Sequence, residues 1–149
     1  KVVSGYAGGT LKNPTYQQVS LGQTNHAEVC EITYNPSEIN LEQMLKIFFA
    51  SHDPTTINRQ GNDVGAHYRS IVFFSGLNEK EVINKVINEL NISVFDEKIV
   101  TQVMPFDAFY AAERYHQNYY ENNTSAPYCS FVISPKVNKL KNELSQFYK

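Results

Sequence analysis

Apolar residues recur along this chain at two spacings, and each spacing predicts a kind of element. A spacing of three or four residues places side chains on one face of a helix, and a spacing of two places them on one face of a strand. The first helical stripe follows Asn40 and contains Leu41, Met44, Leu45 and Phe48. Asn40 can cap that helix, and Pro54 lies beyond its end because proline cannot continue it.

Three further segments have helical spacing. Asn78, with Glu81 three residues later, resembles a capping box ahead of Val82, Val86 and Leu90. Asp107 can cap a helix that carries Phe109, Ala112 and His116. Near the C-terminus, Ser134 as cap and Pro135 at the first helical position predict a helix with Val137, Leu140 and Leu144 turned inward.

Strands are predicted between these helices. Val2–Val3 indicates the end of a strand that enters the glycine-rich turn "GYAGG", and "RSIVFF" (Arg69–Phe74) is typical of a buried strand. A further short strand fits "KIVTQVM", residues 98–104. Strands that alternate with helices predict one sheet covered by helices, in an α/β or α+β domain.

The strand "HAEVCEITY" contains a carboxylate in an apolar row. Alternation places Glu28 on one face with Cys30, Ile32 and Tyr34. A charged side chain on an apolar face is costly unless it is paired or protonated. We therefore expect the pKa of Glu28 to be raised by burial.

Composition limits the class of protein. The 149 residues are enough for a single domain, and a content of 42% hydrophobic and 19% charged residues is that of an ordinary globular protein. The net charge of −2, without a basic run, gives no attraction to nucleic acid or to an anionic membrane, and no apolar stretch is long enough to span one. Two cysteines are too few for a secreted disulfide scaffold, so we expect a reducing compartment, the cytoplasm.

The segment from His52 to Ser70, "HDPTTINRQGNDVGAHYRS", is long and irregular. Long loops in compact domains are often functional. The alternative is a packed Ω-loop whose aspartate and asparagine side chains bond their own backbone. The spacing alone does not choose between the two.

Seven short motifs occur along the chain in a characteristic order: "GYAGG", "NPTY", "HAE", "HDPT", "NRQGND", "HYRS" and "YHQNY". With these motifs in this order, the chain resembles the methionine sulfoxide reductase A family, the peptide-methionine (S)-S-oxide reductases. The resemblance extends over essentially the whole chain. The resemblance implies an α+β fold, a two-layer sandwich with a ferredoxin-like βαββαβ core, a mixed sheet and an irregular C-terminal segment. It implies one domain over residues 1–149 that reduces the S epimer of methionine sulfoxide, free or in proteins, as protein repair.

One motif of the family does not occur. The family's nucleophile is the cysteine of a Gly-Cys-Phe-Trp motif, and the sequence contains no tryptophan. We therefore expect the first strand and the nucleophile helix to be missing from these 149 residues, and the fragment to be inactive alone. If the chain is complete, the alternative is a non-catalytic binder of oxidised-methionine peptides.

The resemblance also assigns site residues. It makes Glu28 of "HAE" the acid that protonates the sulfoxide oxygen, with Tyr16 of "NPTY" and Tyr68 of "HYRS" as hydroxyl donors to the same oxygen. It places Asp63 and His116 at the backbone of the substrate methionine, and Tyr119 in the pocket. A carboxyl whose pKa is raised can donate a proton near neutral pH. Two tyrosine hydroxyls beside it resemble an oxyanion hole.

The two cysteines have different expectations. Cys129, in "APYCSFVISPK", lies one residue further from "HQNY" than the resolving cysteine of some family members, whose disulfide is reduced by thioredoxin. A buried inert thiol near the final helix is the alternative. Cys30 is not expected to be the nucleophile, because its row is typical of core and an activated thiolate needs a helix N-terminus or a cation. We expect a monomer with no bound cofactor and with thioredoxin or another dithiol as reductant.

A metal-dependent hydrolase is a further alternative. His52, Asp53, Asp63, His67 and His116 could supply its ligands. No pair of these residues has the spacing of a metal motif, such as two histidines four residues apart on one helix.

Overall fold

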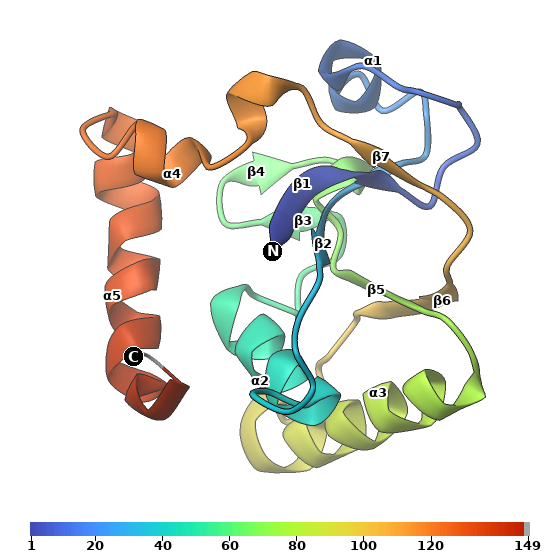
Figure 1. The fold of residues 1–149 in the computed structure, drawn as a ribbon, viewed down its shortest axis with the longest axis vertical. Helices are drawn as coiled ribbons and strands as arrows, with labels where there is room; N and C mark the ends of the chain where they lie inside the picture. Colours follow the sequence, from blue (N-terminus) through green and yellow to red (C-terminus); the bar gives the residue numbers. More distant parts are fainter. Residues whose placement is uncertain (148–149) are drawn as a thin grey trace.

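The computed structural model describes residues 1–147 and has an α+β fold, as predicted (Figure 1). Its strands are β1 (Val2–Ala7), β2 (Ala27–Ile32), β3 (Arg59–Gln60), β4 (Asp63–Val64), β5 (Ile71–Phe74), β6 (Gln102–Pro105) and β7 (Phe109–Ala111). Its α-helices are α1 (Tyr16–Ser20), α2 (Leu41–Ser51), α3 (Leu77–Leu90), α4 (Tyr119–Asn122) and α5 (Ser134–Glu143). Short 3-10 turns include η1 (Ala66–Tyr68) and η3 (Arg114–His116), and π-helical turns are η2 (Asn91–Phe95) and η4 (Cys129–Ile133).

The strands within residues 1–147 form three small sheets in place of the single sheet expected. β1 is the middle strand of an antiparallel sheet in the order β2-β1-β7. β3 and β4 form an antiparallel hairpin, and β5 and β6 pair in parallel. The glycine inside β1 allows a close approach, because a Cβ on Gly5 would lie 2.3 Å from the ring of Phe109.

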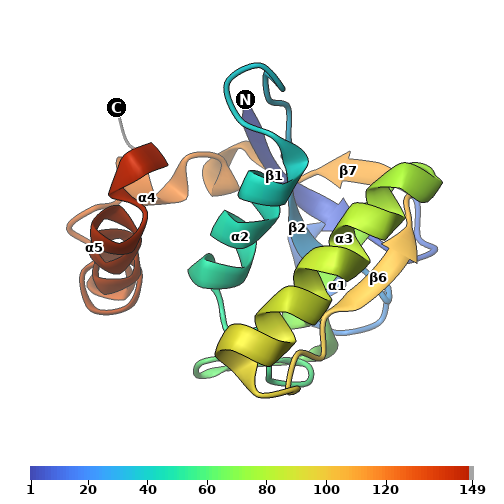
Figure 2. The same ribbon diagram turned by 90° about the horizontal axis from the view of Figure 1, so that it is seen from below.

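The hydrophobic core lies between the two long helices and the β5–β6 pair. Leu45 and Phe49 of α2 and Ile83 and Val86 of α3 are buried together. Side chains of β5 and β6 pack against this cluster, and Figure 2 shows α2 and α3 lying over that part of the fold. The stripe predicted after Asn40 therefore faces the core, and Asn40 caps α2 through a capping box with Gln43.

The C-terminal segment folds back toward α2. α5 packs against η4 and α2, and Figure 1 shows it as an upright helix at the edge of the molecule. The hydroxyls of Tyr120 and Ser134 lie 3.0 Å apart and join α4 to α5. Ser134 is the first residue of α5 and not its cap, because η4 runs directly into the helix.

Three other local predictions were wrong. The segment after Asp107 is the strand β7 instead of a helix, because Phe109–Ala111 pairs with the free edge of β1. α3 begins at Leu77, with Gly76 as its N-cap, so Asn78 lies inside its first turn. β1 continues through Gly5 and Tyr6 and does not end at Val3.

Candidate active site

The irregular segment 52–70 combines the two interpretations left open by its sequence. Asp53 is used locally, since its Oδ1 accepts hydrogen bonds from the backbone N–H of Thr55 at 2.9 Å and from its hydroxyl at 2.6 Å. Asp63 instead begins β4, after a two-residue turn in which Gly61 has a φ of +57°. The loop is therefore self-bonded at one end and presents a carboxylate at the other.

Tyr68 lies where the predicted site residues converge. It ends η1, which packs against β2, the strand that carries Glu28. The pKa of Tyr68 is raised to about 12, mainly by burial and in smaller part by the charges of Glu28, Tyr16 and Asp63. The structure therefore brings these four side chains, from four separate segments, around one place.

Glu28 has the raised pKa that its sequence predicted, although the cause differs in part. Its pKa is raised to about 7 by desolvation and, to a smaller extent, by the charge of Asp63. The apolar row is not core: Glu28 and Cys30 are exposed, and Ile32 is 42% exposed. Desolvation and the charge of Asp63 therefore raise the pKa of the carboxyl, and the rest of its row does not.

Tyr16 also packs against His116. Their ring centroids are 4.5 Å apart, and the ring of Tyr115 lies 4.2 Å from that of His116. The Nε2 atom of His116 is enclosed by protein without a hydrogen-bond partner, 4.0 Å from Oε2 of Glu113. Glu113 also accepts a hydrogen bond from the backbone N–H of Tyr16 at 3.2 Å.

The sequence interpretation missed Tyr128. Its hydroxyl donates to Oδ2 of Asp63 at 2.9 Å, and burial together with that carboxylate raises the pKa of Tyr128 to about 12. The two residues are 65 positions apart, so no spacing rule could pair them. The one available signal was that Tyr128 directly precedes Cys129.

The structure does not group Tyr119 and the two cysteines with the four side chains around Tyr68. The Tyr119 side chain is 39% exposed, and no interaction found within residues 1–147 links its hydroxyl to the other predicted site residues. Cys129 is completely buried at the start of η4. Cys30 is exposed instead of lying in the core, and desolvation still raises the pKa of its thiol, with a hydrogen bond to Ser4 opposing the rise.

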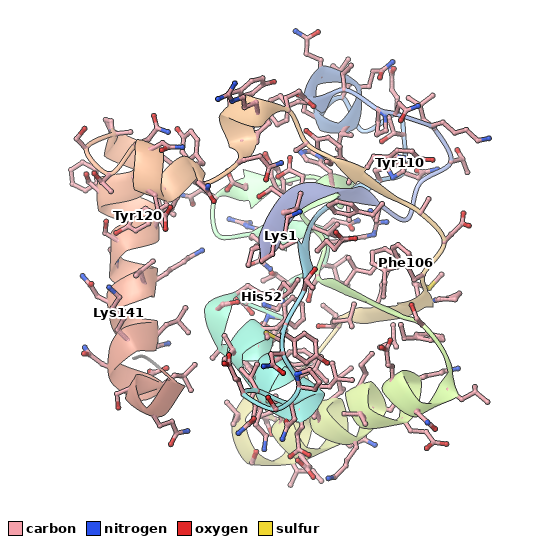
Figure 3. All side chains as sticks on the ribbon, in the orientation of Figure 1. Lys1, His52, Phe106, Tyr110, Tyr120 and Lys141 are labelled. Carbon is pink, nitrogen blue, oxygen red and sulfur yellow. The ribbon has the colours of Figure 1, made fainter. Side chains whose placement is uncertain are left out.

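Two of the other histidines, His26 and His52, hold loops by hydrogen bonds. Nδ1 of His26 accepts from the Gly9 backbone N–H at 3.0 Å, and its Nε2 lies 2.7 Å from the Leu11 carbonyl. His52 follows the last turn of α2 (Figure 3). Its Nδ1 lies 2.7 Å from the Phe48 carbonyl oxygen, and its Nε2 lies 2.7 Å from the Ser70 hydroxyl. Within residues 1–147 no three histidine, cysteine, aspartate or glutamate side chains are grouped so that they could hold a metal ion. The geometry thus does not support a metal-dependent hydrolase.

No helix in the described part of the chain has the length and apolar content needed to cross a membrane.

Comparisons with known proteins agree with this geometry. The family model of peptide methionine sulfoxide reductase matches residues 1–148. The chain is 50% identical, over 142 residues, to the peptide methionine sulfoxide reductase MsrA of Trichodesmium erythraeum, with 95% of this chain and 80% of the relative covered. It is 47% identical to MsrA of Acinetobacter baumannii (strain AYE), with 100% of this chain and 85% of the relative covered.

Solved structures show the same likeness. Reduced Mxr1 of Saccharomyces cerevisiae superposes with a TM-score of 0.81 at 36% identity, covering 86% of this chain and 74% of Mxr1. Methionine sulfoxide reductase A of Corynebacterium diphtheriae gives a TM-score of 0.78 at 30% identity, with 85% and 65% covered. The alternative of a non-catalytic peptide binder has no support from these matches. The chain belongs to the peptide methionine sulfoxide reductase family, whose members reduce methionine sulfoxide to methionine.

Proposed function

We propose that Glu28, Tyr16 and Tyr68 act together on the oxygen of a methionine sulfoxide. One observation supports this assignment above all: η1, which ends at Tyr68, packs against the strand of Glu28, and the charges of Glu28 and Tyr16 both contribute to the raised pKa of Tyr68. The carboxyl and the two phenols therefore share one small region. In this proposal Glu28 is the proton donor and the two tyrosines donate hydrogen bonds to the same oxygen.

The reaction needs an attacking thiolate and a proton for the oxygen. The thiolate attacks the substrate sulfur and forms a sulfur–sulfur bond, while the substrate's sulfur–oxygen bond breaks and its oxygen leaves as water. Water then bonds to the sulfur of the attacking thiol, the sulfur–sulfur bond breaks, and a sulfenic acid and a thioether form. The proton that Glu28 gives to the oxygen is replaced by the one lost from the attacking thiol, so thiol and sulfoxide become sulfenic acid and thioether without net proton change. With a pKa of about 7, Glu28 is protonated in a large fraction of molecules near neutral pH.

The attacking thiolate is taken from the family and not from the two cysteines of this sequence. The pKa of Cys30 is raised, which disfavours its thiolate, and Cys129 is buried. The resemblance assigns the nucleophile to the cysteine of the Gly-Cys-Phe-Trp motif, and the roles proposed here concern only the acid and the hydrogen-bond donors.

Three further residues are proposed to hold the substrate. Asp63 is half-buried beside Tyr68 and accepts the Tyr128 hydroxyl, so a carboxylate oxygen is available near the reacting group. His116 packs on Tyr16, which places an imidazole at the same region. We extend the proposal to Tyr119, which lies three residues beyond His116 at the start of α4. The substrate is methionine sulfoxide, free or in proteins, and the proposal covers the S epimer.

Cys129 is proposed to resolve the sulfenic acid by forming a disulfide. Its neighbour Tyr128 bonds Asp63, so the thiol lies on a segment attached to the site. Because the thiol is buried, the segment around η4 must open before the disulfide can form. A solved structure of Mxr1 in complex with Trx2 matches this chain with a TM-score of 0.54, which supports thioredoxin as the reductant.

We also propose that the protein works as a monomer in the cytoplasm. Both cysteines are free thiols, and thioredoxin-type reduction needs a reducing compartment.

The acid role is tested with Glu28→Gln in the full-length protein. We expect kcat/KM for methionine (S)-sulfoxide to fall on the order of 100-fold, and the wild-type decrease above pH 7 to disappear, because glutamine has no proton to lose. Tyr34→Phe, at a 36% exposed tyrosine outside the site, is the matched control. An unchanged rate across the pH range in Glu28→Gln would refute the proposal.

The resolving role is tested with Cys129→Ser. We expect turnover with thioredoxin to fall at least about 10-fold, while turnover with dithiothreitol, which can reduce the sulfenic acid directly, stays near the wild-type rate. Normal turnover with thioredoxin would show that Cys129 is an inert buried thiol.

A further inference from the structure

Glu113 joins segments of the chain that are far apart in sequence. It lies between β7 and η3, and its carboxylate accepts three hydrogen bonds. The donors are the Tyr6 hydroxyl at 3.3 Å, the Tyr16 backbone N–H at 3.2 Å and the Tyr115 hydroxyl at 2.7 Å. The first two donors are 107 and 97 residues away, so Glu113 closes two long loops.

We propose that Glu113 is a positioning residue for sulfoxide reduction: its carboxylate holds Tyr16 and His116 at the place where the oxygen is bound. The inference rests on the role proposed above for Tyr16. Glu113 does not itself contact the reacting atoms in this proposal, and acts through the two side chains that it holds.

The contacts around Tyr16 support this role. Glu113 bonds the backbone of Tyr16, and the ring of Tyr16 then packs on the ring of His116 at 4.5 Å. The enclosed Nε2 of His116 lies 4.0 Å from Oε2 of Glu113, the same oxygen that accepts from Tyr16 and Tyr115. One carboxylate oxygen therefore lies beside both site residues.

Tyr6 extends the connection to the proposed acid. In the antiparallel β1–β2 pair, Tyr6 is directly opposite Glu28, and its hydroxyl reaches Oε1 of Glu113. Burial and the Glu113 charge raise the pKa of Tyr6, so its hydroxyl stays protonated and can donate. Glu113 thus touches the strand pair that carries Glu28 as well as the segment that carries Tyr16.

The carboxylate is the form that can accept all these bonds. Burial alone would raise the pKa of Glu113, but the hydrogen bonds from Tyr115, the Tyr16 backbone and Tyr6 outweigh it and lower the pKa overall. Glu113 is therefore an anion at neutral pH. A glutamine of the same size could accept through only one oxygen, so Glu113→Gln removes part of the network without leaving a cavity.

The segment that carries Glu113 has a second attachment to β1 that does not depend on the Glu113 charge. Gln117 binds β1 independently, because its Oε1 accepts from the Ser4 backbone N–H at 2.9 Å and its Nε2 donates to the Ser4 and Ala112 carbonyls. We therefore expect Glu113→Gln to fold, with Tyr16 and His116 less well fixed.

A double-mutant cycle tests the inference in the full-length protein. We expect Glu113→Gln to lower kcat about 10-fold and Tyr16→Phe to lower it on the order of 100-fold. If Glu113 acts by placing the Tyr16 hydroxyl, its loss should have little further effect once that hydroxyl is removed. The kcat of the double variant should therefore be within about 2-fold of the kcat of Tyr16→Phe. Glu121→Gln, at an exposed carboxylate of α4, is the matched control.

The outcomes separate the two proposals. A double variant about 1,000-fold slower than wild type, the product of the two single effects, would overturn the positioning role, as would an unchanged kcat in Glu113→Gln. A normal kcat in Tyr16→Phe would refute the proposed role of Tyr16 itself, and the Glu113 inference would fall with it. If Glu113→Gln does not fold, Glu113→Asp, which keeps the charge on a shorter side chain, replaces it in the same cycle.

A spectroscopic measurement examines the contact without turnover. The rings of Tyr16 and Tyr115 lie close to His116, so we expect their ring currents to shift its ring-proton NMR signals. We expect these signals to move toward their random-coil positions in Glu113→Gln but not in Glu121→Gln. Signals that stay in place would overturn the claim that Glu113 holds His116.

Discussion

The α2–α3 side of the molecule and the β1–β2 side are held together by different interactions. On the first side, Leu45, Phe49, Ile83 and Val86 are almost fully buried and apolar. On the second side, β1 and α1 are joined to residues 113–117 by the polar side chains of Glu113 and Gln117. Apolar packing depends on volume, whereas the polar network depends on the position and charge of single atoms.

This difference explains where chemistry is possible. An apolar core has no group that can donate a proton, and it tolerates little change in volume. The site side keeps phenols and carboxylates partly accessible, and desolvation, followed by the charges of neighbouring acidic groups, raises the pKa of Glu28 and of Tyr68. We therefore expect the two sides to respond to different perturbations: the core to changes of size, the site to changes of charge and pH.

The largest effect is expected in the core. Phe49→Ala removes a side chain that is 1% exposed, so the free energy of unfolding should fall by about 4 kcal/mol. Denaturant unfolding would measure it, with Leu77→Ala, at a 74% exposed residue, as the control. A loss below about 1 kcal/mol would mean that the helical side is not packed as the structure shows.

The next effect concerns the charge of Glu28 and depends on pH. The folded-state pKa of about 7 is higher than the ordinary value of 4.5, so the folded state binds the proton more tightly than the unfolded state. The stabilisation from this proton is complete below pH 4.5 and is lost as the pH rises through 7. Glutamine does not titrate, so Glu28→Gln should gain stability relative to wild type between pH 5 and pH 8.5.

We expect that gain to be about 1.5 kcal/mol, because solvent screening reduces the effect at an exposed carboxyl. Thermal unfolding at the two pH values would measure it, and Glu31→Gln on the same strand is the control. If the difference between Glu28→Gln and wild type is independent of pH, the carboxyl has an ordinary pKa and the contrast between the two sides is weaker than proposed.

A smaller effect is expected where the C-terminal segment meets the loop. Tyr128→Phe removes the hydroxyl that donates to Asp63 at 2.9 Å, and its loss should cost about 1 kcal/mol of local stability. Faster amide hydrogen exchange in residues 126–133 would report the loss, while the core helices α2 and α3 should be unaffected. Equal exchange in both proteins would contradict a stabilising role for this bond.

The smallest effect is expected on the outer surface of the helical side. Lys46 bonds Glu42 at 2.9 Å, but Lys46 is exposed and a second lysine, Lys85, lies 3.4 Å from the same carboxylate. We expect Lys46→Ala to change Tm by no more than about 1 °C, since exposed ion pairs are screened and their partners are replaceable. A larger decrease, removed by 1 M NaCl, would show that surface charge also supports this side.

Predictions from the sequence were correct where residues close together in the chain determine the local structure. The stripe after Asn40 and its capping residue were sufficient for α2, and the motifs were sufficient for the family and for the α+β class. Prediction failed after Asp107, where pairing with β1 overrode the helical spacing of Phe109 and Ala112. The N-cap of α3 is Gly76 and not the predicted Asn78, which is a smaller error at a helix boundary.

The raised pKa of Glu28 combines a correct prediction with a wrong one. Its position on a strand predicted the direction of the shift, but the predicted cause was the apolar row, and that row is largely exposed. The actual surroundings include Asp63, which is 35 residues further along the chain. A pattern within one strand could not contain that information.

The sequence by itself determined the apolar stripe of α2, its Asn40 cap and the residue types of the site, because these depend on neighbours within a few positions. Only the tertiary structure decided that Tyr128 bonds Asp63 and that Glu113 joins Tyr6, Tyr16 and Tyr115. Such contacts join residues up to 107 positions apart, and they form only when the whole chain has folded.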